Sequence, residues 1–412
     1  MTPSITMSAT AQHYLELEEQ YGAHNYHPLP VVLSRGKGVH VWDVDGKQYF
    51  DFLSGYSAVN QGHCHPAILQ TFIEQSQQLT LTSRAFHSDR LGEYVKFITD
   101  YFGYDKVLPM NTGVEAVETA IKLCRKWAYE VKGIEEHKAV ILVCEGNFHG
   151  RTSTVISFSS DPSARKNFGP YMPGFKAIPY SDPQALAVAL KDKNVAGFLV
   201  EPIQGEAGVL VPDDGYLAKA KELCEAAHVL FIADEIQTGL ARTGKMLACD
   251  HEDVKPDILI LGKALSGGTL PVSAVLCNDD IMLNIKPGQH GSTYGGNPLA
   301  CAIAITALQI LKDEHLCENA EEMGIYFRQQ LAELNSPFIK IIRGKGLLNA
   351  IVIEHEDKEA AWNLCIEMMH NGLIAKPTHG DKIRFAPPLL ISKTEIDECV
   401  AIIAKSLAVL QS

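Results

Sequence analysis

Runs of apolar residues alternate along the chain with segments in which apolar side chains recur at every third or fourth position. Short runs that are rich in branched residues predict buried strands at 139–144, 196–201, 229–233, 258–261 and 272–277. In residues 114–131 the apolar positions follow helical spacing, which predicts an amphipathic helix. Because strands and helices alternate, we expect an α/β fold with a doubly wound, mainly parallel sheet.

The pattern differs on either side of this central region. Residues 39–43 and 47–51 predict a β-hairpin with an Asp-Gly turn. From about Cys317 the chain alternates helices with isolated strands, which is typical of an α+β module. We therefore expect three parts, which are an N-terminal arm with a small sheet (1–56), a large domain (57–314) and a small C-terminal α+β domain (315–412).

Two of the apolar runs end in charged residues that a parallel sheet would bring together. Asp234 follows the run 229–233, and Lys263 follows 258–261 after one glycine. In open α/β sheets, ligands bind just outside the carboxyl ends of the strands. Pyridoxal phosphate needs a lysine for its aldehyde and a carboxylate that keeps its ring nitrogen protonated. A plain ion pair at the sheet edge is the alternative for these two residues taken alone.

Two loops have the composition of phosphate sites. Thr112 and Gly113 precede the 114–131 helix, whose N-terminus can bind an anion, although simple helix capping explains the same residues. The loop 291–298 has three glycines and the hydroxyls of Ser292 and Thr293. The G-x-x-x-x-G-K match at 239–245 is followed by methionine in place of Ser or Thr, so we do not expect a nucleotide site there.

The composition narrows the classes of partner. A net charge of −13 over 412 residues argues against nucleic acid. The ten cysteines are scattered without a C-x-x-C pair, which is typical of a reduced, intracellular protein. His63-Cys64-His65 has no second group of ligands at metal-site spacing, so no metal is expected.

The beginning of the chain bears on its location. Residues 1–34 contain no lysine or arginine, whereas a mitochondrial presequence is rich in arginine and a secretory signal begins with basic residues. No apolar run approaches the ~20 residues that span a bilayer. We therefore expect a cytoplasmic protein without a membrane partner.

Taken together, these segments resemble the class III, fold type I, pyridoxal-phosphate-dependent aminotransferases. The likeness extends from Tyr21 to Pro388 through ordered motifs, namely YGAHNYHPLP, SGYSAVNQGHCHP, LPMNTGVEA, EPIQGEAG, FIADEIQTGLARTG, LGKALSGG, GSTYGGNP, RGKGLLNAI and KPTHGDKIRFAPP. It implies a fold type I transferase, in which a large domain with a mainly parallel, doubly wound sheet is joined to a smaller α+β domain.

The resemblance also implies a cofactor site. Lys263 would bind pyridoxal 5'-phosphate covalently and Asp234 would pair with its ring nitrogen, which makes these two the expected catalytic residues. The further residues expected to bind the cofactor are Thr112, Gly113, Val114, Phe148, Gln237, Ser292 and Thr293. Thr293 would reach the phosphate of the neighbouring subunit, so a homodimer with shared active sites is expected.

Within the family, the likeness is greatest to enzymes that transfer the δ-amino group of L-ornithine to 2-oxoglutarate. It implies that glutamate 5-semialdehyde and glutamate form in a ping-pong reaction. Tyr26 and Arg151 would hold the α-amino and α-carboxylate groups of ornithine, and Tyr56 would line the pocket. Glu206 would pair with Arg384 while ornithine reacts and would release it to the 2-oxo acid.

Other functions fit some of these residues. His87 and His149 stand where other aromatic residues are expected in the animal enzymes, and the motif at 148–152 is also typical of class III enzymes that act on N-acetylornithine or GABA. An aminomutase would need no 2-oxo acid, whereas Arg151 and Arg384 together suit a dicarboxylate. A non-catalytic scaffold would need neither Lys263 nor Asp234, and the chain has both.

Overall fold

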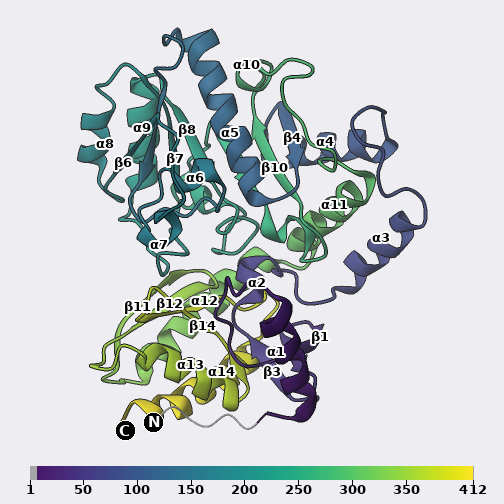
Figure 1. Ribbon diagram of the computed structural model, residues 1–412, viewed down its shortest axis with the longest axis vertical. Helices are drawn as coiled ribbons and strands as arrows, with labels where there is room; N and C mark the ends of the chain where they lie inside the picture. Colours follow the sequence, from purple (N-terminus) through teal and green to yellow (C-terminus); the bar gives the residue numbers. More distant parts are fainter. Residues whose placement is uncertain (1–6, 412) are drawn as a thin grey trace.

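Two parts of unequal size form the molecule in a computed structural model that describes residues 7–411 (Figure 1). The larger part is built on a seven-stranded sheet in the order β4-β10-β9-β8-β7-β5-β6. Its strands are β4 (Lys106–Met110), β5 (Val140–Cys144), β6 (Phe175–Ile178), β7 (Val195–Val200), β8 (Leu230–Asp234), β9 (Ile258–Leu261) and β10 (Ser273–Cys277). β10 is antiparallel to both neighbours, and the strands from β9 to β6 pair in parallel. The predicted mainly parallel α/β fold is confirmed.

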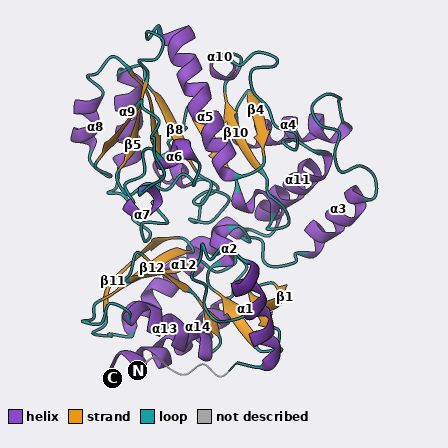
Figure 2. Cartoon of the chain, viewed as in Figure 1, coloured by secondary structure: helices purple, strands orange, loops and turns teal. Residues whose placement is uncertain are grey.

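Helices cover both faces of this sheet (Figure 2). Alternate residues of a strand point to opposite faces, so Ile232 shares a core with Val117 of α5 while Phe231 shares a second core with Leu217 of α9. The helices of this part are α3 (Pro66–Ser76), α4 (Asp89–Phe102), α5 (Gly113–Trp127), α6 (Ser153–Ile156), α7 (Pro162–Arg165), α8 (Pro183–Ala189), α9 (Tyr216–Ala226), α10 (Asp279–Met282) and α11 (Pro298–Asp313). The predicted helix at 114–131 is α5, continued by a π-helical turn at Ala128–Lys132.

The smaller part contains two four-stranded sheets, in the orders β1-β2-β3-β13 and β11-β12-β15-β14. The strands are β1 (Leu33–Lys37), β2 (His40–Asp43), β3 (Gln48–Asp51), β11 (Ile339–Lys345), β12 (Leu348–Ile353), β13 (Leu373–Ile374), β14 (Lys376–Thr378) and β15 (Lys382–Phe385). The helices are α1 (Ala9–Tyr21), α12 (Leu316–Glu333), α13 (Ala360–His370) and α14 (Lys393–Ser406). The predicted hairpin is β2 paired with β3, and β13 from near the end of the chain joins it in parallel.

The predicted division at residues 56 and 314 stays a prediction, and its first six residues and last residue lie outside those described. The pairing of β3 with β13 places the N-terminal hairpin in a sheet with a C-terminal strand. The first and the last described helical segments, α1 and Leu407–Gln411, both lie in the smaller part (Figure 1). Within residues 7–411, no helix is both long and apolar enough to cross a membrane.

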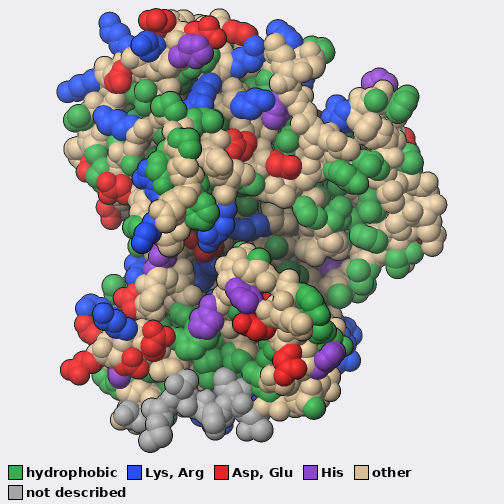
Figure 3. All heavy atoms as spheres, in the orientation of Figure 1, with side chains coloured by type: hydrophobic (Ala, Val, Ile, Leu, Met, Phe, Trp, Pro, Cys, Tyr) green, Lys and Arg blue, Asp and Glu red, His purple; other side chains and the backbone are tan. Residues whose placement is uncertain are grey.

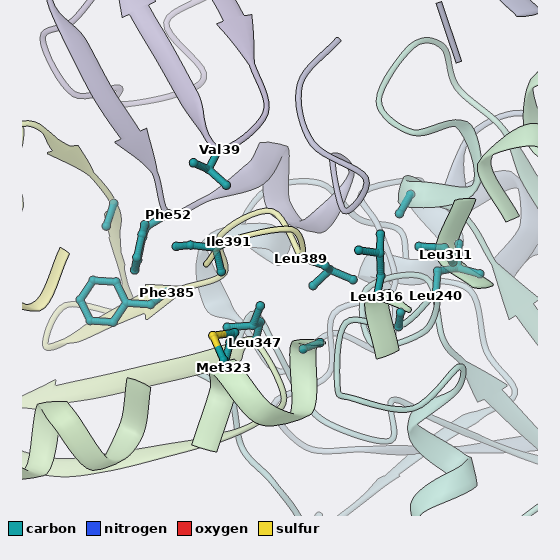
Figure 4. Packing of buried hydrophobic residues seen from close by; sticks show 14 of the residues in the cluster. Val39, Phe52, Leu240, Leu311, Leu316, Met323, Leu347, Phe385, Leu389 and Ile391 are labelled. Carbon is teal, nitrogen blue, oxygen red and sulfur yellow. The ribbon is translucent and has the colours of Figure 1, made fainter. Parts of the chain in front are cut away.

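A core of apolar side chains continues from one part into the other (Figure 4). It includes Leu240 and Leu311 of the larger part together with Phe52 and Phe385 of the smaller part. The rings of Phe52, Phe327 and Phe385 meet edge to face with their centroids 5.6 to 5.8 Å apart. This shared core fixes the position of the β15 strand relative to the large sheet.

The segment 54–65 differs from what its composition predicts. Its glycine-rich and polar composition predicts no regular structure, but α2 (Ser54–Ser57) is a compact turn in which Ser54, Gly55, Tyr56 and Ser57 all have positive φ, from 49° to 68°. Asp51 holds the beginning of this turn, because its Oδ1 atom accepts the N–H groups of Leu53 and Ser54 at 2.9 Å. A run of left-handed residues is rare outside glycine and needs such tertiary support.

Candidate active site

The carboxyl ends of β8 and β9 bring Asp234 and Lys263 into one cavity of about 160 Å³, called here the inner cavity. The two strands are apolar and wholly buried, so polar side chains first emerge where they end. Lys263 has φ of 45°, which turns the chain sharply from β9 into the turn Lys263–Ser266. The cavity lies where the two parts of the molecule meet, and the space-filling view shows charged side chains in the hollow between them (Figure 3).

Asp234 is buried and held from two sides. Its Oδ2 atom lies 2.6 Å from Nδ1 of His149, and its Oδ1 atom accepts the N–H of Ile236 at 3.1 Å. Burial acts to lower the pKa of His149, but the hydrogen bond and the charge of Asp234 outweigh burial and raise this pKa. Among the described residues, His149 Nε2 is buried without a hydrogen-bond partner. The histidine therefore orients the carboxylate toward the cavity.

Glu201 is a second buried acid in the cavity wall. Its carboxylate accepts the N–H of Phe148 at 2.9 Å. Burial raises the pKa of Glu201 to about 8, although the positive charge of His149 and the hydrogen bond from Phe148 act in the opposite direction. At neutral pH Glu201 is therefore largely protonated.

Lys263 is a cation in this cavity without a fixed partner in the described part of the chain. Burial lowers its pKa, and the charge of Arg384 adds to this effect while the charge of Glu206 opposes it. A lowered pKa enlarges the fraction of neutral amine, which is the nucleophilic and basic form. The lysine is thus suited to attack a carbonyl and to move a proton.

An ion pair between the two parts closes one side of the inner cavity. Arg384 on β15 is 2% exposed and donates from Nη1 to Oε1 of Glu206 at 2.8 Å. Gln237 donates from Nε2 to the same oxygen at 3.1 Å. Burial acts to raise the pKa of Glu206, but the positive charges of Arg384 and Lys263 outweigh it and lower this pKa. Glu206 is therefore ionised and neutralises Arg384.

The left-handed turn places Tyr56 against this ion pair. The guanidinium carbon of Arg384 lies 5.2 Å from the centroid of the Tyr56 ring. Burial raises the pKa of Tyr56, and the charge of Glu206 adds to the rise while Arg384 opposes it. Tyr56 is thus a neutral phenol beside the ion pair of Glu206 and Arg384.

A second cavity of about 350 Å³, the outer cavity, adjoins the first. The two share Phe148, His149, Gly150 and Glu206 in their walls. Arg151 lines the outer cavity, and its guanidinium carbon lies 5.6 Å from the centroid of the Phe148 ring. The residues with ionisable side chains that also line it are Asp161, His379 and Lys382.

The N-terminus of α5 points at the inner cavity. Thr112 caps this helix, because its Oγ1 accepts the N–H of Glu115 at 3.4 Å while the carboxylate of Glu115 accepts the N–H of Thr112 at 3.0 Å. The side chain of Thr112 therefore caps the helix, which was the second explanation of its position. The N–H groups of Gly113 and Val114 have no partner within the helix, and both residues line the cavity.

Three expected site residues lie elsewhere in the single chain. Tyr26 is 63% exposed and lines neither cavity, although the ammonium of Lys376 lies 5.9 Å from its ring. Ser292 and Thr293 line a separate cavity of about 490 Å³, where Ser292 accepts a hydrogen bond from Asn111 at 2.7 Å. The roles of these residues stay predictions.

The residues of the inner cavity fit pyridoxal phosphate. The cavity combines a lysine for the aldehyde, a buried carboxylate for the ring nitrogen and free helix N–H groups for the phosphate. The exposed ring of Phe148 stands at its wall. Each chemical group of the cofactor thus has a matching group in the protein.

Comparison with known proteins agrees with this site. The model of the family named aminotransferase class-III matches residues 21–407. The chain belongs to this family of pyridoxal-phosphate-dependent transaminases, which confirms the predicted class, enzyme type and cofactor.

Individual relatives cover nearly the whole chain. The mitochondrial ornithine aminotransferase of Rattus norvegicus is 62% identical over 97% of this chain and 91% of its own length. A Toxoplasma gondii ornithine aminotransferase structure, described with partial occupancy of pyridoxal phosphate at its active site, is 50% identical with a TM-score of 0.95 over 97% of this chain and 95% of that one. An acetylornithine aminotransferase structure from Elizabethkingia anophelis is 57% identical with a TM-score of 0.89 over 97% of this chain and 99% of that one.

The expected cytoplasmic location is contradicted by these comparisons. The relatives from rat, two Drosophila species and Caenorhabditis elegans are all named as mitochondrial proteins, which points to mitochondria. The expectation rested on residues 1–34, of which the first six lie outside the described structure. Targeting segments are separate from the folded domain, so the residues that form the fold carry no information on the compartment.

The sequence alone did not indicate several contacts and residues in the walls of the inner and outer cavities. The contact between His149 and Asp234 joins residues 85 positions apart, and no local pattern indicates it. Asp161 and Lys382 come to the outer cavity from distant segments as well. The signal available in the sequence was only that His149 follows Phe148 in a loop after a predicted strand.

Proposed function

We propose that the enzyme transfers the δ-amino group of L-ornithine to 2-oxoglutarate, producing glutamate 5-semialdehyde and glutamate in a ping-pong reaction. The observation that carries this proposal is the 2.8 Å ion pair between Glu206 and Arg384 beside Lys263. The names of the ornithine aminotransferases of rat and Toxoplasma gondii support the same substrate.

The ion pair explains how one pocket accepts two different substrates. A free Arg384 would attract the α-carboxylate of ornithine and would present the wrong amine to the reacting centre. With Glu206 on Arg384, the α-carboxylate is left to Arg151 in the outer cavity, and the δ-amine extends to the inner cavity. The two carboxylates of 2-oxoglutarate require both Arg151 and Arg384, so Glu206 must release the latter.

The chain's own residues then position groups and move protons. Bound pyridoxal phosphate supplies the carbonyl that receives the amino group and a ring that accepts electrons. Asp234, oriented by His149, would keep the ring nitrogen of the bound cofactor protonated. The neutral amine of Lys263 would take a proton from Cδ of the substrate. Phe148 covers the reacting groups from water.

We propose that the active enzyme is a homodimer. Ser292 and Thr293 lie away from the chain's own inner cavity, which is the arrangement expected if Thr293 serves the neighbouring subunit. Mixing a Thr293→Ala chain with a Lys263→Ala chain tests this, because each mixed dimer then contains one site with both groups intact and one site that lacks both. Activity should therefore recover on mixing, whereas a threonine that served its own chain would leave both sites damaged. Sedimentation at a single monomer mass would contradict the proposal.

Absorbance spectra of the cofactor-loaded enzyme test the reaction. Ornithine alone should convert the visible band of the enzyme into a near-ultraviolet band, and 2-oxoglutarate should restore it. A visible band that ornithine leaves unchanged would exclude ornithine as a substrate.

N-acetylornithine is a second candidate substrate, favoured by the likeness to the acetylornithine aminotransferase described above. The same spectra separate the two substrates. Faster conversion by N-acetylornithine than by ornithine would replace our proposal with this one.

A further inference from the structure

Two side chains of opposite charge line the outer cavity. We propose that Asp161 binds the α-ammonium group of ornithine while Arg151 holds its α-carboxylate, so that Asp161 sets the preference for a free α-amino group. This inference rests on the proposed function. It assigns to the α-ammonium group, for which the resemblance implies the Tyr26 hydroxyl, a counter-charge that neither Tyr26 nor Arg151 provides.

The connection between the two cavities makes this placement possible. Phe148, Gly150 and Glu206 belong to the walls of both, so the outer cavity continues directly from the inner one. A substrate whose reacting amine lies beside Lys263 therefore extends its other end past Phe148. That end is the amino acid head of ornithine, which carries one negative and one positive charge.

In the outer cavity, Asp161 is the acid and Arg151 the arginine that no ion pair with a described residue occupies. Glu206 is taken by Arg384, and Lys382 is paired with Asp381 at 2.5 Å. Arg151 makes no ion pair with any described residue. Asp161 accepts hydrogen bonds at 2.8 Å from the N–H and the hydroxyl of Ser163, and its carboxylate oxygens have capacity for a further donor.

Asp161 is charged and lies within electrostatic reach of Arg151. Burial acts to raise the pKa of Asp161, but the hydrogen bonds from Ser163 and the positive charges of His379 and Arg151 outweigh it and lower this pKa. Asp161 and Arg151 form no ion pair with each other among the described residues, and both line the outer cavity, so both can contact a substrate head bound there. The carboxylate and guanidinium match an α-amino acid in charge.

The same acid has the opposite effect on the second substrate. 2-Oxoglutarate brings a carboxylate to Arg151 but has no ammonium group, so Asp161 repels it. Removal of the Asp161 charge should therefore weaken the reaction with ornithine and leave the reaction with 2-oxoglutarate unchanged or faster. A purely structural role of Asp161 would impair both reactions alike.

The variant Asp161→Asn isolates the charge. Asp161 is the N-cap of α7 and is followed by Pro162, and asparagine caps helices as well as aspartate does. The chain offers a matched control in Asp182→Asn. Asp182 is the N-cap of α8, is followed by Pro183 and accepts the N–H of Ala185 at 2.8 Å, but it lines neither cavity.

Single-turnover spectra of the cofactor-loaded enzyme measure the effect with three probes, namely ornithine, 5-aminopentanoate and 2-oxoglutarate. 5-Aminopentanoate is ornithine without the α-amino group. In Asp161→Asn, kcat/KM for ornithine should fall by about tenfold or more, the loss expected for a charge-assisted hydrogen bond. The rates with 5-aminopentanoate should stay within about twofold, and Asp182→Asn should alter none of the three.

An unchanged ratio of ornithine to 5-aminopentanoate rates in Asp161→Asn would overturn this inference alone. An equal fall with all three probes would overturn it too, because it would indicate a structural role. A wild-type enzyme that does not react with ornithine would instead overturn the proposed function, and this inference with it.

Discussion

At the scale of single residues, the site is a set of buried charges whose partners can be exchanged. Arg384 is paired with Glu206, and Asp234 is oriented by His149. Lys263 has no fixed partner among the residues described. Asp234 is therefore held on two sides. Lys263 and Arg384 are the groups proposed to change partners during the reaction.

Replacement of Lys263 by alanine should abolish turnover without unfolding the protein. The proposed reaction needs its amine for proton transfer, a contribution of roughly 10²–10⁴-fold or more. The fold loses little, because the ammonium makes no hydrogen bond or ion pair within residues 7–411. Steady-state assays and circular dichroism measure the two effects. Lys405→Ala, on the exposed side of α14, is the control, and wild-type turnover by Lys263→Ala would refute the role.

Replacement of Glu206 by glutamine should change which amine reacts. Glutamine keeps the size of the side chain but leaves Arg384 without its counter-charge. We expect reaction of α-amino groups, measured with L-glutamate as amino donor, to accelerate by about tenfold relative to reaction of the ornithine δ-amine. Single-turnover rates with the two donors provide the ratio. A constant ratio would mean that Glu206 does not mask the arginine.

The buried acid Glu201 should make stability depend on pH. Its pKa of about 8 in the folded protein lies above the ordinary value of 4.5, so the folded state holds a proton that the unfolded chain releases. Stability from this group is therefore full below pH 4.5 and is lost as the pH rises toward 8.

Glu201→Gln cannot titrate and should gain stability relative to wild type across that range, by at most about 1.4 kcal/mol per pH unit. Urea unfolding at several pH values, with saturating cofactor in every sample, measures the difference. Parallel pH curves for the two proteins would show that Glu201 is ionised in the folded state.

At the scale of elements, the sequence predicts what local pattern determines. The runs at 229–233, 258–261 and 272–277 are strands because continuous apolar side chains are satisfied only between two layers of helices. The carboxyl ends of these strands placed Asp234 and Lys263 correctly in one cavity. Contacts between distant segments, such as His149 with Asp234, leave no such pattern and required the structure.

The left-handed turn at Ser54–Ser57 is likewise a feature that local sequence does not predict. Serine and tyrosine have no preference for positive φ, so their conformation comes from Asp51 and from burial rather than from local sequence. The turn matters because it carries Tyr56 to Arg384.

Two glycine substitutions should therefore have opposite effects. Gly55 has φ of 57°, so Gly55→Ala should lower the free energy of unfolding by about 1 kcal/mol. Gly92 lies in α4 with open space around it, so Gly92→Ala should raise this free energy by about 0.5–1 kcal/mol. Urea unfolding measures both. The same sign for both variants would contradict the conformational argument.

At the scale of the whole molecule, a buried arginine ties the two parts together. Arg242 is 0% exposed and donates to the carbonyls of Leu347 and Pro387 and to Oδ1 of Asn60, at 2.6 to 2.9 Å. It belongs to the Gly239–Lys245 loop, which matches the G-x-x-x-x-G-K pattern but lacks the Ser or Thr of a phosphate loop. The segments that it joins carry Tyr56 and Arg384.

Replacement of Arg242 by methionine should destabilise the protein by about 3 kcal/mol or more, because three buried acceptors lose their donor. Reaction with both substrates should also slow, since Tyr56 and Arg384 lose a common support. Thermal unfolding and the two half-reaction rates measure these effects. Wild-type stability would show that the junction depends on its apolar core alone.

The pairing of β3 with β13 has a consequence for synthesis of the chain on the ribosome. Phe50 and Asp51 of β3 pair with Leu373 and Ile374 of β13. The sheet therefore lacks its fourth strand until nearly all of the polypeptide has been made. Because synthesis proceeds at roughly 5–20 residues per second, the edge of the hairpin stays unpaired for tens of seconds. The strands of the large sheet emerge complete during that interval. The nascent hairpin therefore presents an unpaired strand edge, at which another chain can pair, for most of the time that synthesis takes.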